Sequence, residues 1–160
     1  MSLHNELLIE ARLRVVGPAP SQAALRRGVS DAYYALFHAI GFEIARAYPS
    51  AVQAGAKRIL DHVKAKKMAA WINGNRTLPA LSRIAACPEV LFPVAKNFCL
   101  LQEARHVADY DERQPLTKTE VEALIQRADL SLQALNVARD ECPNELYAFV
   151  LSLVFDRWQK

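Results

Sequence analysis

Arginine, histidine, aspartate and tyrosine side chains crowd one short segment, residues 102–111. Arg105 and Asp109 are four residues apart, which makes them neighbours on a helix, and His106 and Tyr110 follow on an adjacent face. A guanidinium can bind phosphate at two points, and an imidazole can take a proton from a ribose hydroxyl. The segment therefore predicts phosphate binding or metal-independent RNA cleavage. The alternative is a plain Arg105–Asp109 ion pair that holds the helix end.

A second line of polar side chains belongs to a segment that we expect to be a long helix. Arg27, Asp31, Tyr34 and His38 step by four, three and four residues, so they stack along one side of that helix. One interpretation is a polar seam that faces a ligand or a partner helix. The other is a solvated face with an Arg27–Asp31 pair, in which the tyrosine and histidine are satisfied structural residues.

Positive charge is concentrated in residues 56–86, where seven lysines and arginines accompany a single aspartate. This segment has a net charge of +6, so the rest of the chain has −3. Arg58, His62 and Lys67 lie within it. Such a concentration can neutralise phosphates and favours a nucleic-acid partner. The alternative is a solvated lysine face, because no aromatic-interleaved nucleic-acid motif accompanies it.

Other common chemistries have little support in the sequence. The four histidines lie on separate segments without HxxxH or HExxH spacing, so we expect no metal site. The three cysteines lack CxxC spacing and are typical of reduced thiols in a cytoplasmic protein. No P-loop, GxGxxG loop or catalytic-serine elbow is present, so we expect no cofactor.

The elements that must position these residues are all expected to be helices. The chain has 160 residues, enough for one domain, and no segment alternates with the period of two that a strand needs. Apolar residues recur at helical spacing instead. They predict an all-α fold, an up-and-down helical bundle of four to five main helices with the core of the domain at about residues 21–139. The expected helices span residues 3–15, 22–48, 57–72, 93–110 and 118–141.

A further short helix is expected at 143–158, and it is apolar nearly all round. Leu146, Phe149, Val150 and Val154 are among its large apolar residues. Such a helix either fills a central slot of its own chain or covers a partner subunit. No apolar run reaches the roughly 20 residues of a membrane span. The Met1 end lacks a basic-then-apolar layout, so we expect no signal peptide and a cytoplasmic location.

Two of the polar segments together resemble the prokaryotic HEPN domain family. The first is RRGVSDAYYALFH, from Arg26 to His38, and the second is LQEARHVADYD, from Leu101 to Asp111. They resemble the branch of that family with an AYYAxFH helix and an RxxADYD segment, and the resemblance spans about residues 21–139. It implies a helical bundle that often dimerises and is commonly directed at RNA. It also implies a toxin–antitoxin or stress-response setting, with a nucleotidyltransferase-like antitoxin as partner.

In the ribonuclease members of that family, an arginine is followed four to six residues later by a histidine. Arg105 matches the arginine, but positions 110–112 hold Tyr110, Asp111 and Glu112. The ribonuclease motif is therefore incomplete. His106 is adjacent to Arg105 in sequence, and about 100° away from it around a helix.

Three hypotheses follow from these observations. The first is a cytoplasmic, dimeric module that binds RNA or a nucleotide-bearing partner. Arg105, His106, Asp109 and Tyr110 would face Tyr34 and His38 across a cleft, while Arg58, His62 and Lys67 hold phosphates. The second is a metal-independent endoribonuclease in which Arg105 stabilises the phosphate and His106 or His38 is the base. The third is a non-catalytic structural partner.

Overall fold

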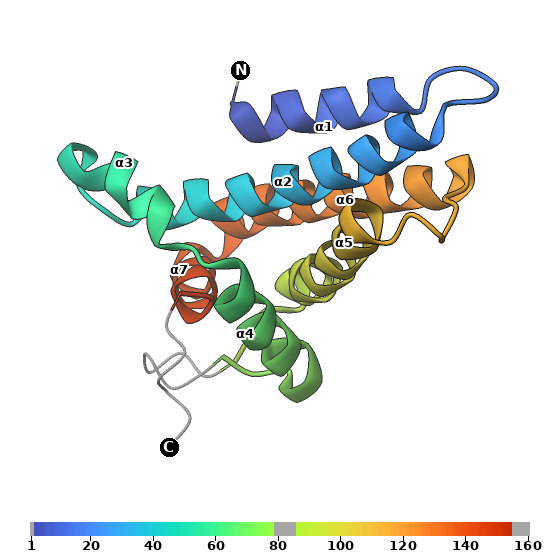
Figure 1. The fold of residues 1–160 in the computed structure, drawn as a ribbon. Helices are drawn as coiled ribbons and strands as arrows, with labels where there is room; N and C mark the ends of the chain where they lie inside the picture. The colour runs from blue at the N-terminus through green and yellow to red at the C-terminus, as the bar shows by residue number, and fades with distance from the viewer. Residues whose placement is uncertain (1, 79–85, 155–160) are drawn as a thin grey trace.

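The computed structural model describes residues 2–78 and 86–154, and its regular structure is helical (Figure 1). Within these residues there is no strand, only an isolated bridge between Thr77 and Ala86. The all-α prediction is therefore confirmed. The α-helices are α1 (Leu3–Arg14), α2 (Gln22–Arg46), α3 (Gln53–Ala56), α4 (His62–Asn75), α5 (Phe92–Tyr110), α6 (Lys118–Glu141) and α7 (Pro143–Ser152).

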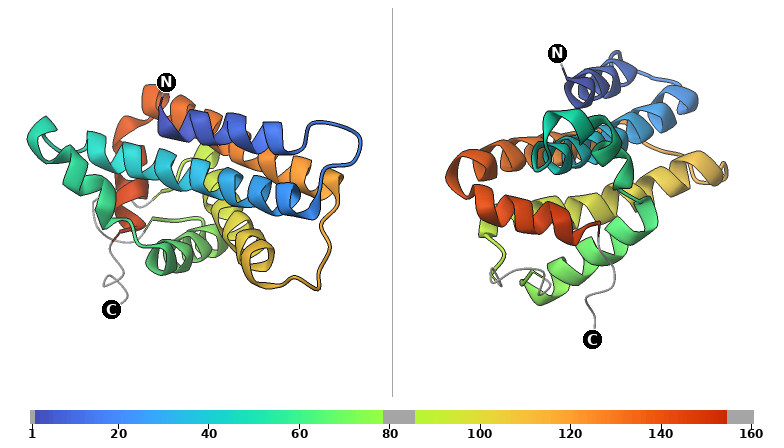
Figure 2. Two further views of the ribbon diagram at one scale, coloured as in Figure 1. Left: turned by 45° about the horizontal axis from the view of Figure 1, so that its top comes forward. Right: turned by 90° about the vertical axis from the view of Figure 1, so that its left-hand side faces the viewer.

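The long helix α2 organises the rest of the chain. The Ser21 side chain caps it, and its apolar stripe includes Val29, Leu36 and Ile40, all fully buried. Helices α1 and α6 run beside α2, while α5 contacts it from another side and α4 packs against α5 (Figures 1 and 2). This arrangement brings α2, α4 and α5 together, and these helices carry most of the candidate site residues.

Side-chain caps define where α2, α4 and α6 begin. Thr117 and Glu120 form the expected capping box at the start of α6. The helix expected at 57–72 begins instead at His62, so the predicted start was wrong. Asp61 accepts hydrogen bonds from the Val63 and Lys64 amides and caps α4, while Lys57–Ile59 form a separate 3-10 turn. The cap makes His62 the first residue of α4, next to α2.

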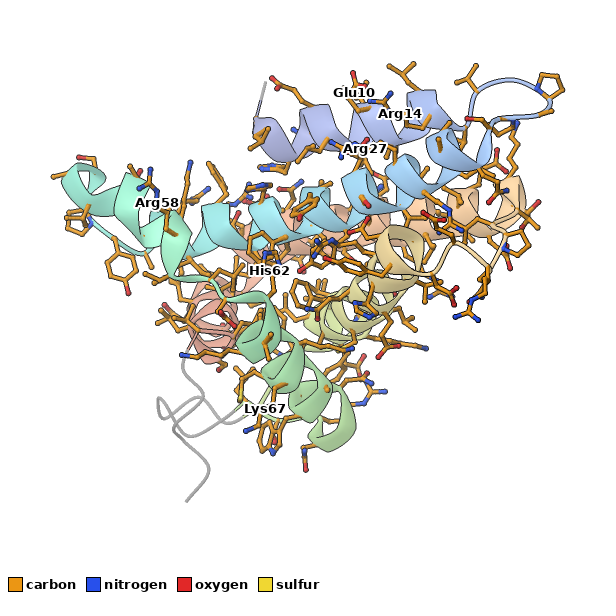
Figure 3. All side chains as sticks on the ribbon, in the orientation of Figure 1. Glu10, Arg14, Arg27, Arg58, His62 and Lys67 are labelled. Carbon is orange, nitrogen blue, oxygen red and sulfur yellow. The ribbon has the colours of Figure 1, made fainter. Side chains whose placement is uncertain are left out.

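Helix α1 is held against α2 by a close approach and by charge. At Gly28 a Cβ would lie 3.3 Å from Val121 Cγ1 and 3.5 Å from the Ala11 carbonyl oxygen, so α1, α2 and α6 meet where only a glycine fits without movement. Asp31 is buried and lies 3.2 Å from Arg27 and 3.6 Å from Arg14 of α1. The Arg14–Asp31 pair therefore joins α1 to α2, while Arg27 pairs with Asp31 within α2 (Figure 3).

The apolar C-terminal helix fills the core of its own chain. Leu146, Phe149 and Val150 are at most 1% exposed, and α7 packs against α2 and α6. The sequence left open whether this helix fills the core of its own chain or covers a partner subunit. For these three side chains, the structure shows the first alternative. The predicted extension of this helix to Trp158 lies outside the described residues. Within those residues no helix has the length and apolarity needed to cross a membrane.

A buried carboxylate ties the far end of α2 to α6. The Glu43 side chain is 2% exposed, and the Arg139 Nε atom donates to it at 3.1 Å, with a second bond from Nη2. The guanidinium therefore compensates for removing the carboxylate from water. Arg46 is 3.9 Å from the same carboxylate, but its own side chain is 40% exposed.

This difference gives a test of the packing between α2 and α6. Arg139→Ala leaves Glu43 buried without its main partner, and we expect it to lower the free energy of unfolding by about 3–5 kcal/mol. Arg46→Ala removes an exposed cation from the same carboxylate, and we expect a loss below about 1 kcal/mol. Urea unfolding followed by circular dichroism measures both. Equal losses in the two variants would contradict the assignment of Arg139 as the compensating charge.

Candidate functional site

Four polar side chains come together where α2, α4 and α5 meet. Three of them were predicted as site residues, and the fourth, Tyr33, was not. The Arg105 guanidinium carbon lies 5.4 Å from the centre of the Tyr33 ring and 5.0 Å from that of Tyr34. The ring centres of Tyr34 and His62 are 6.1 Å apart. We call Tyr33, Tyr34, His62 and Arg105 the Arg105 cluster. It joins residues more than 70 positions apart in the sequence.

Arg105 is oriented by an acidic side chain of its own helix. Its Nε atom donates to Asp109 Oδ2 at 2.9 Å, and Asp109 Oδ1 accepts a bond of 2.7 Å from the Ser30 hydroxyl of α2. Among the described residues, the two terminal nitrogens of Arg105 donate no hydrogen bond, and the side chain is 22% exposed. The Nε atom of this guanidinium is occupied, two tyrosine rings lie near its carbon, and both terminal nitrogens are left to donate. It is therefore arranged for a two-point contact with an oxyanion.

The His62 ring packs against side chains of α2, and its backbone is bonded to α5. Its ring stacks on Phe37 with centroids 4.0 Å apart and planes 14° apart, and Nδ1 lies 2.5 Å from the Tyr33 hydroxyl. Gln102 donates to the backbone carbonyl of His62 at 2.9 Å, which fixes the first turn of α4 against α5. The Gln102 Oε1 atom is buried and has no hydrogen-bond partner within the described residues.

Burial keeps both members of the Tyr33–His62 pair neutral. Desolvation is the main cause that lowers the pKa of His62, followed by the nearby charge of Arg105. Desolvation also raises the pKa of Tyr33 well above its usual range. A protonated phenol beside a neutral imidazole donates to Nδ1, because the opposite direction would leave the buried hydroxyl hydrogen without an acceptor. The proton of His62 then resides on Nε2, so this histidine can offer a donor to a ligand.

The remaining histidine candidates are placed differently. His38 lies beside Tyr34, with ring centres 6.2 Å apart, and burial, followed by the charge of Lys57, lowers its pKa. His106 is exposed, and its ring lies 5.0 Å from that of Tyr110, which is 71% exposed. The structure therefore brings Tyr34, His38 and Arg105 into one neighbourhood and leaves His106 and Tyr110 on the outer side of α5.

The other predicted binding residues do not join the cluster directly. Arg27 and Asp31 form an ion pair within α2, and Asp31 also pairs with Arg14 of α1. Arg58 lies in the turn before α4, and Lys67 lies farther along α4, with His62 between them (Figure 3). Both cations are exposed and form no ion pair within the described residues. They are solvated cations that lie before and after His62 in the sequence, outside the cluster.

Sequence reasoning missed Tyr33 and Ser30 as members of the site. Both lie on the buried side of α2, where the apolar stripe predicted only core packing. The available signal was chemical: a tyrosine or serine placed among core residues needs a hydrogen-bond partner. The partners are His62 and Asp109, which are distant in sequence, so the pairing itself could not be read from local spacing.

Comparison with known proteins leaves the geometry as the main guide to function. No protein-family model, curated protein or solved structure matches the chain. Within the described residues, no three histidine, cysteine, aspartate or glutamate side chains form a group that could hold a metal ion. The arrangement around Arg105 is therefore interpreted from its own donors, rings and charges.

The neutral state of His62 predicts a pH dependence. The pKa of His62 is lowered in the folded state, so the unfolded chain binds a proton more readily. The free energy of unfolding must therefore fall as the pH drops from above the usual histidine pKa of about 6.5 to below the pKa of the folded state. NMR titration of the ring should give a midpoint below the usual value. Urea unfolding should show that His62→Gln flattens part of the decline, whereas exposed His106→Gln does not. A midpoint at or above the usual value would contradict the buried Tyr33–His62 pair.

Proposed function

We propose that the protein is a cytoplasmic HEPN-like module that binds single-stranded RNA through the Arg105 cluster without cleaving it. The observation that carries the proposal is the state of Arg105, which is oriented by Asp109, flanked by two tyrosine rings and left with two donors for a phosphate. The partly exposed Tyr34 and His38 add rings on which a base could stack. Arg58 and Lys67 extend the positive surface on either side of His62.

The state of His62 favours binding over catalysis. A general base needs an unprotonated nitrogen that faces the substrate. The basic nitrogen of His62 accepts from Tyr33 instead, and His106 lies on the outer side of α5. The incomplete ribonuclease motif at positions 110–112 agrees with this interpretation. His38, which lies beside Tyr34, is the remaining candidate base, so endonucleolytic cleavage by Arg105 and a nearby histidine is the competing outcome of the experiment below.

Fluorescence anisotropy with a labelled mixed-sequence RNA, in EDTA and at about 50 mM salt, tests the proposal. Arg105→Gln should weaken binding about tenfold or more, because it removes a charge-assisted contact to phosphate. The matched control is Arg113→Gln, which removes the same charge from the exposed loop after α5 and should change binding by no more than about twofold. Circular dichroism should confirm that both variants are folded.

The same samples distinguish the alternatives. The proposal expects the RNA to stay intact on a denaturing gel. If the wild-type protein cleaves the RNA and Arg105→Gln does not, the protein is an endoribonuclease and the binding proposal is wrong. If the wild-type protein fails to bind RNA at low salt, both nucleic-acid functions are wrong and a structural role becomes the better account.

The HEPN resemblance adds a homodimer and a nucleotidyltransferase-like antitoxin partner to the proposal. Sedimentation equilibrium at micromolar concentration should then give a mass twice that of the 17.9 kDa chain. Because Leu146, Phe149 and Val150 are buried in the core, their substitution would unfold the subunit instead of reporting on an interface. A monomer over the whole concentration range would remove the dimer from the proposal.

A further inference from the structure

A second positively charged region lies away from the Arg105 cluster, in a hollow between the end of α4, the start of α5 and the middle of α6. We call it the α4–α6 hollow. It has a volume of about 730 Å³, within the range typical of small-molecule sites. Its charged lining residues are Arg76, Lys96, Arg127 and Glu89, so three cations face one carboxylate. Within the described residues, none of the three cations forms an ion pair.

Two of these cations are held in place by neighbouring groups. The Arg76 guanidinium carbon lies 4.2 Å from the centre of the Phe92 ring. Arg76 also ends α4 in the left-handed conformation, with φ of 59°, and its amide donates to the Ile72 carbonyl. An Arg127 Nη atom lies 3.4 Å from Asn97 Oδ1. Charges fixed in this way lose less side-chain freedom when a ligand binds.

The buried amide of Asn97 supports the α6 wall of the hollow. Asn97 is 5% exposed, and its Nδ2 atom donates to the Arg127 carbonyl and to the Ser131 hydroxyl. Lys96, adjacent to it, is exposed in the early part of α5. The positive end of the α5 dipole lies on the same side, because Phe92 and Pro93 of its first turn also line the hollow.

We infer that the α4–α6 hollow binds a compact ligand with two or more linked phosphate groups. Three cations from three separate elements surround one concavity, so they can contact different phosphates of the same ligand at once. A ligand with linked phosphates carries more negative charge than a single phosphate and extends it farther along the hollow, so it suits cations that come from α4, α5 and α6. The Phe92 ring and the Asn73 amide supply an apolar face and a polar group for the remainder of the ligand.

This site is separate from the proposed RNA surface. Lys96 and Arg105 are nine residues apart on α5, which places them on opposite sides of the helix, roughly 180° apart. The hollow is also lined from α6, whereas the Arg105 cluster comes from α2, α4 and α5. Each proposal can therefore fail without the other.

Isothermal titration calorimetry of the full chain with inorganic triphosphate tests the inference. Arg127→Gln, Lys96→Gln and Arg76→Asn should each weaken binding about tenfold, as expected for one charge-assisted contact. Asparagine suits position 76 because it tolerates the left-handed conformation. The control Lys64→Gln removes an exposed charge from α4 outside the hollow and should change the affinity by no more than about twofold. Thermal melts should show that all variants are folded.

Further ligands identify the source of the phosphates. Orthophosphate should bind at least about tenfold more weakly than triphosphate, because it engages fewer cations. Stronger binding of a nucleoside triphosphate than of triphosphate would show that the ligand carries a base, and equal binding would show that the phosphates suffice.

Four results would overturn the inference. The first is the absence of a binding heat with triphosphate, and the second is an affinity for orthophosphate equal to that for triphosphate. The third is loss of triphosphate binding in Arg105→Gln. The fourth is an Arg127→Gln variant that loses RNA binding but keeps triphosphate binding. The third result would assign the phosphate ligand to the Arg105 cluster, and the fourth would make the α4–α6 hollow part of the RNA surface.

Discussion

The ion pair between Arg105 and Asp109 is the interaction on which the proposed function depends. Asp109 holds the guanidinium by its Nε atom and is itself fixed to α2 by the Ser30 hydroxyl. The tyrosine rings flank the same guanidinium. Because α2, α4 and α5 all contribute to this neighbourhood, the helix packing and the polar site share one set of contacts. An arginine constrained in this way presents its remaining donors in a defined direction, which a freely moving surface arginine does not.

Helical periodicity predicted the architecture well because burial of one helix face is a local pattern. The ranges expected for α1, α2, α5 and α6 agree with the structure to within two residues, and their ends coincide with Ser21, Thr117 and similar capping signals. The predicted start of α4 was wrong because the side chain of Asp61 accepts hydrogen bonds from two backbone amides and caps the helix there. The prediction treated Asp61 only as a charge in a basic segment. The location of α7 could not be predicted, since an apolar helix is equally suited to a core and an interface.

The candidate site was only partly predictable for a different reason. Spacing placed Arg105 beside Asp109 and Tyr34 beside His38, and these pairs are present. The histidine nearest Arg105 in sequence, His106, is exposed on the outer side of α5, whereas His62, 43 residues before Arg105, belongs to α4. Likewise the polar line on α2 divides: Asp31 binds Arg14 of α1, and Tyr34 faces α5. Contacts between helices decide both outcomes, and a single sequence does not contain the orientation of one helix against another.

The central claim is that RNA meets Arg105, Tyr34 and His62 on one surface. The most direct measurement is an NMR titration of the folded chain with single-stranded RNA, following the Arg105 Nε–H signal and the ring signals of the four histidines. The account predicts that the Arg105 and His62 signals shift together and saturate at the same RNA concentration, while the ring of His106 stays in place. Shifts confined to His106 and Tyr110, with Arg105 and His62 unchanged, would contradict it.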